Sequence, residues 1–203
     1  MTVHQFILTT DNFYTANAQP YFDQTVDLDM HLLQDQFLGR LPKRGRILDA
    51  GSGSGRDTLA FLKRGYVVDA FDASERLAAL SSQFTGNRTR ILRFQDFEGQ
   101  SLYEGIWACA SILHVSEKEL PSVLRKLGSA LKKGGTLYAS FKLGHGFRLS
   151  ADGRAYTDLN LGTAATHFGR IPYFSDLYMW NTEAMDNEPG WLNVIATRSY
   201  RSN

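Results

Sequence analysis

A glycine-rich segment near residue 50 constrains the fold of this chain more than any other stretch. Residues 46–50, Arg-Ile-Leu-Asp-Ala, form an apolar run typical of a buried strand, and Gly51, Gly53 and Gly55 follow. From Thr58 onward the spacing of apolar residues is helical. Because glycine tolerates positive φ and admits a ligand close to the main chain, the segment predicts a strand, a ligand-binding loop and a helix. A loop that only packs the helix closely on a sheet is the structural alternative.

Two common nucleotide-binding motifs do not fit this segment. The dinucleotide fingerprint needs glycine at its first, third and sixth positions, but the sixth position counted from Gly51 is Arg56. A P-loop needs Gly-Lys-Ser or Gly-Lys-Thr, which is missing here. What remains is an acid, Asp49, two residues before Gly-x-Gly-x-Gly, and a helix N-terminus that suits a carboxylate or another anion.

Strand-like and helix-like segments alternate through the middle of the chain. Strands are expected at 46–50, 66–71, 89–94, 105–110 and 135–141, and helices at 56–64, 74–84 and 120–132. This alternation predicts a parallel sheet with helices on both faces. Ligands of such sheets bind at the carboxyl ends of the strands, so chemistry is expected there.

The rhythm changes after residue 141. We expect a polar loop at 142–158, a weak helix at 159–171, and two strands at 173–182 and 191–198. Turn-forming residues at 183–190 separate the two strands, which predicts an antiparallel hairpin at the sheet edge.

A helical cap is predicted before the first strand. Apolar residues from Thr25 to Leu41 form a helical stripe that ends at Pro42. The aromatic pairs at 13–14 and 21–22 either pack this cap on the core or cover a ligand. Since 203 residues suit one well-buried domain, we expect a single domain over 1–203, with the cap at 1–41 and the core at 42–203.

Composition narrows the class of partner. The chain has 22 Lys and Arg against 21 Asp and Glu, interspersed, so it lacks the basic footprint of a nucleic-acid-binding protein. Cys109 is the only cysteine and lies in an apolar run, which favours a small buried residue in a reducing compartment. With no bilayer-spanning stretch and no signal-peptide pattern, we expect a cytoplasmic protein without a membrane partner. The scattered histidines predict no metal site, and the oligomeric state stays open.

Acidic residues follow two of the predicted strands. Asp72 lies about twenty residues past the glycine loop, where a carboxylate can accept hydrogen bonds from ribose hydroxyls. The alternative is a helix N-terminal charge beside Ser74. Asp96 and Phe97 suit an adenine, through its amino group and its face, or else are a turn acid and a core ring.

The fourth predicted strand ends in small residues. Ala110 and Ser111 leave room for the reactive end of a ligand, and His114 follows them. A histidine at this place can act as a general base, although a lone histidine at a strand-to-helix junction is more often structural.

These positions together resemble the class I S-adenosylmethionine-dependent methyltransferases, whose motif I matches Asp49 and the three glycines. The resemblance covers roughly residues 13–198. It implies a Rossmann-like three-layer sandwich with a mostly parallel seven-stranded sheet that ends in an antiparallel hairpin, and S-adenosylmethionine as cofactor. Arg56 and Asp57 directly follow the glycine motif, and in this respect the chain resembles the small tellurite-resistance-type members of the family, where Gly-Arg often follows that motif. The cofactor-binding residues that we expect are Tyr14, Tyr21, Asp49, Gly51, Ser52, Gly53, Gly55, Arg56, Asp72, Ala73, Gln95, Asp96, Phe97 and Ala110.

The resemblance also implies the reaction. In that family a methyl group moves from a sulfonium to a nucleophile in one displacement, so the protein mainly orients the reactants and excludes water. The chain lacks the Asn/Asp-Pro-Pro-aromatic and Pro-Cys motifs of enzymes that methylate nucleic-acid bases. We therefore expect a small-molecule acceptor with an oxygen, sulfur or chalcogen nucleophile, anionic or soft. A non-catalytic sensor of S-adenosylmethionine or S-adenosylhomocysteine is the alternative, and an NAD-type oxidoreductase is disfavoured by Arg56. Acceptor-side and catalytic candidates are His114, Lys142, His145, Arg148, Arg154 and Tyr156.

Overall fold

The computed structural model describes residues 3–183 and 189–200, with side chains from residue 10, and is built on a seven-stranded sheet in the order β3-β2-β1-β4-β5-β9-β8. Neighbours from β3 to β5 are parallel, whereas β9 is antiparallel to both β5 and β8. The predicted mostly parallel sheet with a final antiparallel hairpin is confirmed. The strands of this sheet are β1 (Arg46–Ala50), β2 (Val67–Asp72), β3 (Thr89–Ile91), β4 (Tyr103–Ala108), β5 (Leu131–Lys142), β8 (Phe174–Thr182) and β9 (Trp191–Arg198).

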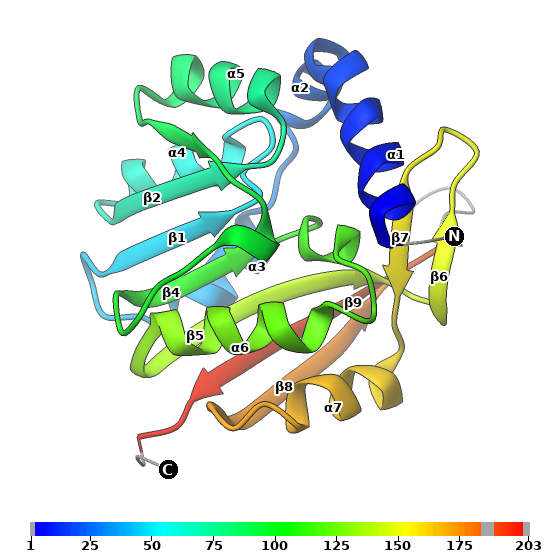
Figure 1. Cartoon of the computed structure of the whole chain (residues 1–203). Coiled ribbons are helices and arrows are strands. Elements are labelled where there is room, and N and C mark those ends of the chain that lie inside the picture. The colour runs from blue at the N-terminus through cyan, green and yellow to red at the C-terminus, as the bar shows by residue number, and fades with distance from the viewer. Residues whose placement is uncertain (1–2, 184–188, 201–203) are drawn as a thin grey trace.

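Helices cover both faces of the sheet, which makes three layers (Figure 1). Ile47 and Trp107 pack in one cluster with Phe37 of α3 (His31–Leu38) and with α4 (Arg56–Lys63). Their neighbours Leu48 and Ile106 point the other way, toward α6 (Leu120–Ala130) and α7 (Leu161–Gly169). This alternation follows from the two-residue period of a strand, and it explains why the buried strands are apolar throughout.

Local signals set the ends of the core helices. The Ser74 hydroxyl accepts a hydrogen bond from the Leu77 N–H at 3.3 Å, so Ser74 caps α5 (Glu75–Thr85) as predicted. Asn160 caps α7, which therefore begins two residues later than expected. Helix α6 ends at Ala130 because Leu131 is already the first, buried residue of β5.

The predicted helix over 25–41 is wrong. The N-terminal region contains α1 (Val3–Ala16), α2 (Ala18–Thr25) and the shorter α3. The carboxylate of Asp29 accepts the His31 backbone N–H at 2.9 Å, which starts α3 only at His31. The apolar stripe therefore belongs to a linker and a helix, and not to one continuous helix.

The predicted polar loop over 142–158 is also wrong, because this segment contains two antiparallel strands, β6 (Gly146–Leu149) and β7 (Ala155–Asp158). Gly153 has φ 87° in the turn, and Asp152 accepts the Arg154 backbone N–H at 3.1 Å. Asp-Gly is a hairpin-turn signal that the sequence analysis overlooked. In Figure 1 this hairpin lies beside α1, at the carboxyl ends of the parallel strands. Most of the predicted turn over 183–190 lies outside the described residues.

Candidate active site

The glycine loop is shaped by positive φ angles and by close neighbours. Gly51, Gly53 and Gly55 have φ angles of 77°, 55° and 80°. A Cβ atom at Gly51 would lie 2.5 Å from the Cβ atom of Ser111, and one at Gly53 would lie 3.3 Å from the Tyr21 ring. Glycine at 51 is therefore required by packing as well as by φ, and glycine at 53 keeps the cavity in front of the loop open.

Asp49 supports this loop from behind. The carboxylate is buried and accepts a hydrogen bond from the Thr58 hydroxyl of α4 at 2.6 Å. Burial raises the pKa of Asp49 to about 7, and the nearby Asp57 charge adds to the effect. Asp49 lines neither cavity described below, because it shares the strand face of Ile47. In this structure Asp49 supports the loop, and its expected contact with the cofactor stays a prediction.

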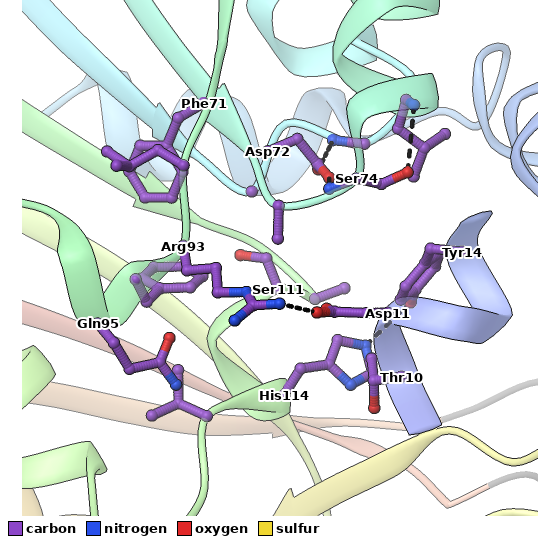
Figure 2. A pocket seen from close by; sticks show the side chains of 18 of the residues that line it. Thr10, Asp11, Tyr14, Phe71, Asp72, Ser74, Arg93, Gln95, Ser111 and His114 are labelled. Carbon is purple, nitrogen blue, oxygen red and sulfur yellow. Dashed lines mark hydrogen bonds and ion pairs between the residues drawn. The ribbon is translucent and has the colours of Figure 1, made fainter. Parts of the chain in front are cut away.

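The first cavity lies in front of the loop, at the ends of β1, β2 and β4 (Figure 2). The Asp72 carboxylate is nearly buried and accepts backbone N–H groups from Gly53 and Ser74, both at 2.8 Å. Burial raises the pKa of Asp72 to about 6, and the two N–H donors partly offset this rise. Of the expected cofactor residues, the first cavity is lined by Tyr14, Tyr21, Gly51, Gly53, Asp72, Ala73, Gln95 and Ala110.

Asp96 and Phe97 do not line the first cavity. Strand β3 ends at Ile91, and Asp96 is the last residue of the short helix η1 (Phe94–Asp96) that follows it. The Phe97 ring is buried and stacks on the Phe71 ring, with centroids 5.6 Å apart. The cavity wall at this end is made by Leu92, Arg93, Phe94 and Gln95, and the expected adenine contacts of Asp96 and Phe97 stay a prediction.

A second, larger cavity of about 1020 Å³ opens beside the first. The expected residues Ser52, Arg56, Lys142, Arg154 and Tyr156 line only this cavity. The glycine Gly55 lines neither cavity, since its missing Cβ would face Ser81 and Thr85. The residues that both cavities share are Tyr14, Tyr21, Gly51, Gly53, Ala110 and His114.

His145 and Arg148, two catalytic candidates, line neither cavity. Arg148 forms a two-point ion pair with Asp158, and the His145 ring lies 3.0 Å from the Asn160 side-chain nitrogen. The structure therefore does not bring them to either cavity, and their catalytic role stays an untested prediction.

Carboxylates balance the cationic groups of the second cavity. Arg56 Nη2 lies 2.7 Å from Asp57, which also accepts hydrogen bonds from Gln34 and Trp107. Arg154 Nη2 lies 2.6 Å from Asp152. The lining of the second cavity includes four acidic residues, Asp29, Asp57, Asp152 and Glu183, and three basic residues, Arg56, Lys142 and Arg154. The cavity is polar and aromatic without an excess of positive charge.

The backbone is strained where the two cavities meet. Ala110 has φ 50°, a left-handed conformation that L-residues rarely adopt, and its N–H donates to the Ser140 hydroxyl at 2.7 Å. Ser111 donates to the Ala50 carbonyl at 2.6 Å, which ties this turn to the end of β1. Burial raises the pKa of the neighbouring Cys109 thiol to about 12, so the thiol stays protonated, as the apolar surroundings predicted.

One buried polar atom has no partner within the described part of the chain. The Ser52 hydroxyl, at the tip of the glycine loop, forms no hydrogen bond, although Ser52 lines the second cavity. Because an unpaired buried hydroxyl is costly, its position indicates that the loop is built to receive a polar ligand group.

Helix α1 supplies residues that the sequence analysis did not single out. Thr10 accepts the Ala155 N–H at 3.0 Å, and Asp11 forms an ion pair with Arg93 at the first cavity. In Figure 2, Asp11 and Tyr14 reach from α1 toward Arg93 and His114. These contacts join residues far apart in the sequence, so no local pattern could have identified them. The only signal in the sequence was the acidic Asp11 close to the aromatic residues of the N-terminal segment.

Comparison with known proteins places this arrangement in context. Residues 23–177 match the model of a family described as a methyltransferase domain. A relative in Bacillus subtilis strain 168, named "Putative methyltransferase YqeM", is 24% identical over 162 residues, which cover 72% of this chain. The matched region spans 65% of the length of that relative.

Solved structures share the fold. The Burkholderia thailandensis 1,6-didemethyltoxoflavin-N1-methyltransferase, bound to its namesake compound and S-adenosylhomocysteine, superimposes with a TM-score of 0.78 at 18% identity. It covers 98% of this chain and 91% of its own. DhpI, in complex with S-adenosylhomocysteine, gives 0.72 at 20% identity over 98% of this chain and its own full length. Among the described residues, no helix combines the length and apolarity needed to cross a bilayer.

Proposed function

Because this chain belongs to the methyltransferase domain family, we propose that it is an S-adenosylmethionine-dependent methyltransferase acting on a small molecule. One observation carries the proposal: an open glycine loop, a ribose-type carboxylate and an unpaired buried hydroxyl all face one pair of joined cavities. The narrower likeness to tellurite-resistance enzymes stays a prediction.

The cofactor fits the residues that are present. The Asp72 carboxylate would accept the ribose hydroxyls, and Ala73, Arg93 and Gln95 would surround the adenine. The Ser52 hydroxyl would pair with a polar group of the methionine end. When bound, S-adenosylmethionine supplies an electrophilic methyl group. The protein residues orient it toward the junction of the two cavities.

The acceptor is assigned to the second cavity. Its volume suits a small molecule, and its lining is aromatic and polar, as in Tyr21, Tyr156 and Trp191. The balanced charges favour a neutral acceptor with an oxygen or sulfur nucleophile over a strongly anionic one. With residues 1–41 as a cap over the core of 42–203, the site would be screened from water.

Methyl transfer tests the proposal. The purified chain is incubated with S-adenosylmethionine labelled in its methyl group and a panel of phenols, thiols and carboxylic acids. We expect labelled product from a neutral phenol or thiol, and saturable binding of S-adenosylhomocysteine by calorimetry. Absence of binding on a folded sample would overturn the proposal. Binding without transfer across the whole panel would favour a sensor.

A further inference from the structure

His114 is hydrogen-bonded at both ring nitrogens, and its two partners differ in kind. Nδ1 lies 2.8 Å from the carbonyl oxygen of Ala155 in β7, and Nε2 lies 2.9 Å from the hydroxyl of Tyr14 in α1. The ring itself lies on the short helix η2 (Ile112–His114). Three segments distant in sequence therefore meet in one hydrogen-bonded chain.

The carbonyl decides where the protons lie. A carbonyl oxygen can only accept, so Nδ1 must carry the proton of the neutral ring, and Nε2 is left as an acceptor. The Tyr14 hydroxyl must then donate to Nε2. Burial lowers the pKa of His114 to about 4, so the ring stays neutral at physiological pH. The Tyr14 proton is thereby directed at His114, and only lone pairs of its oxygen remain for other partners.

Tyr14 stands where this matters, because it lines both cavities. Three groups face the pair. The Tyr21 ring lies 5.0 Å from the Tyr14 ring, and the Tyr156 ring lies 4.9 Å from the His114 ring. The third group is the Arg154 guanidinium, which is paired with Asp152. The Arg154 guanidinium also donates a hydrogen bond to the Tyr14 oxygen and occupies one of its lone pairs, so one lone pair is left for a ligand; burial is the larger influence on the phenol and raises the pKa of Tyr14. The phenol thus stays protonated, with its oxygen as a hydrogen-bond acceptor.

We propose that Tyr14 is the acceptor-selecting residue of this site. Its oxygen accepts a hydrogen bond from an O–H, S–H or N–H group of the methyl acceptor, and His114 with the Ala155 carbonyl fixes that polarity. The enzyme then takes neutral acceptors that arrive protonated, such as phenols or thiols, and rejects molecules of the same shape that lack the donor. The proton that the acceptor loses on methylation passes to the Tyr14 oxygen while Tyr14 passes its own proton to His114 Nε2, and the imidazolium then releases a proton to water. The inference rests on the proposed function for the identity of the ligand, while the hydrogen-bond polarity stands on the protein alone.

The polarity can be measured without any ligand. Nitrogen-15 NMR of the histidine-labelled chain is expected to find the His114 ring protonated at Nδ1 and bare at Nε2, with no titration above about pH 5. A ring protonated at Nε2, or an imidazolium at pH 7, would overturn the proposal. Failure of S-adenosylhomocysteine to bind would instead overturn the proposed function and leave this result intact.

Selectivity is measured on the protein saturated with S-adenosylhomocysteine, with phenol and toluene, which has a methyl group in place of the hydroxyl, as matched probes in ligand-observed NMR. We expect the wild-type chain to prefer phenol at least about tenfold, which corresponds to one well-formed hydrogen bond to a buried partner. Tyr14→Phe removes the oxygen and is expected to bring the two affinities within about threefold of each other. A preference for phenol that survives Tyr14→Phe would overturn the proposal.

Two further variants separate positioning from bulk effects. His114→Asn can still donate to the Ala155 carbonyl but offers Tyr14 no ring acceptor, so the freed hydroxyl can turn and donate. The phenol preference is then expected to fall although the Tyr14 oxygen remains. Tyr178→Phe removes an exposed hydroxyl that lines neither cavity and is expected to keep the preference. An unchanged preference in His114→Asn would show that His114 does not set the polarity.

Discussion

The two cavities of this protein are built by different means. The first is made at the ends of neighbouring parallel strands, where the glycine loop and Asp72 follow β1 and β2 within a short stretch of chain. The second shares the glycine loop and adds residues of α1, α2, the start of α4, β5, the β6–β7 hairpin and the last two strands. Under the proposed function, the first cavity would hold the cofactor and the second would hold the acceptor.

The sharpest way to break this division is to fill the glycine loop. Gly51→Ala forces a left-handed alanine and a Cβ atom 2.5 Å from Ser111, so we expect loss of S-adenosylhomocysteine binding and a large drop in the free energy of unfolding. Gly65→Ala is the matched control, because Gly65 has φ 84° with nothing within 4 Å of its Cβ position.

The control should lose roughly 1–2 kcal/mol through backbone strain alone, and Gly51→Ala roughly 1–3 kcal/mol more through overpacking. Urea unfolding and calorimetry measure both effects. Equal destabilisation of the two variants, with binding retained in Gly51→Ala, would contradict the geometry of the loop.

The next largest effect is expected from the ribose carboxylate. Asp72→Ala leaves the ribose hydroxyls unpaired and should weaken S-adenosylhomocysteine binding by roughly 1–3 kcal/mol, about 5- to 150-fold, with the fold retained. Asp176→Ala, at an exposed carboxylate on β8, is the control and should bind like the wild type. Unaltered affinity in Asp72→Ala would remove the first cavity from cofactor binding.

Asp49 distinguishes support of the loop from contact with the ligand. Its folded-state pKa of about 7 exceeds the ordinary 3.8, so the folded protein binds the proton more tightly than the unfolded chain. Stability is therefore lost as pH rises from about 4 through 7. Asp49→Asn lacks this loss. The free energy of unfolding of the variant relative to that of the wild type should therefore be higher at pH 8 than at pH 5, by roughly 1–3 kcal/mol.

Urea unfolding at the two pH values measures the difference. For the control Asp176→Asn, the change in the free energy of unfolding relative to the wild type should be the same at both pH values. Because Asp49 lines neither cavity, its variant should bind S-adenosylhomocysteine within about threefold of the wild type. A strong loss of affinity with pH-independent stability would place Asp49 in contact with the cofactor after all.

The smallest effect is expected at the loop tip. Ser52→Ala removes a buried hydroxyl that has no protein partner among the described residues, so the unliganded protein should keep or slightly gain stability. Its affinity for S-adenosylhomocysteine should fall by roughly 0.5–1.5 kcal/mol, about 2- to 12-fold. The exposed Ser122 provides a control through Ser122→Ala. Lower stability with unchanged affinity would mean that the hydroxyl serves the fold.

The positions of the glycine loop, Asp72 and the Ser74 cap were predictable because their signals are local. The strand face of Asp49, which is that of Ile47 and α4, was not predictable, because a motif records only the presence of an acid. Asp96 lies outside the first cavity because β3 ends at Ile91, earlier than predicted, and propensity does not fix strand ends. The roles of Asp49 and Asp96 toward the cofactor stay predictions.

The second cavity could be predicted only in part. Lys142 and Tyr156 do line it, but the Tyr14–His114 hydrogen bond joins residues 100 positions apart, and Thr10 with Ala155 joins residues 145 apart. Such pairs depend on how the N-terminal helices pack, which no periodicity encodes. The Asp152-Gly153 turn was readable, and would have placed Arg154 directly before a strand rather than inside a long loop.

The division between the two cavities is tested most directly by a crystal structure of the protein with S-adenosylhomocysteine. The ribose hydroxyls are predicted within hydrogen-bonding distance of Asp72, with the sulfur at the junction formed by Gly51, Ala110 and Tyr14. The second cavity should remain open to an acceptor. An adenosyl group lodged in the second cavity, or away from Asp72, would contradict the account.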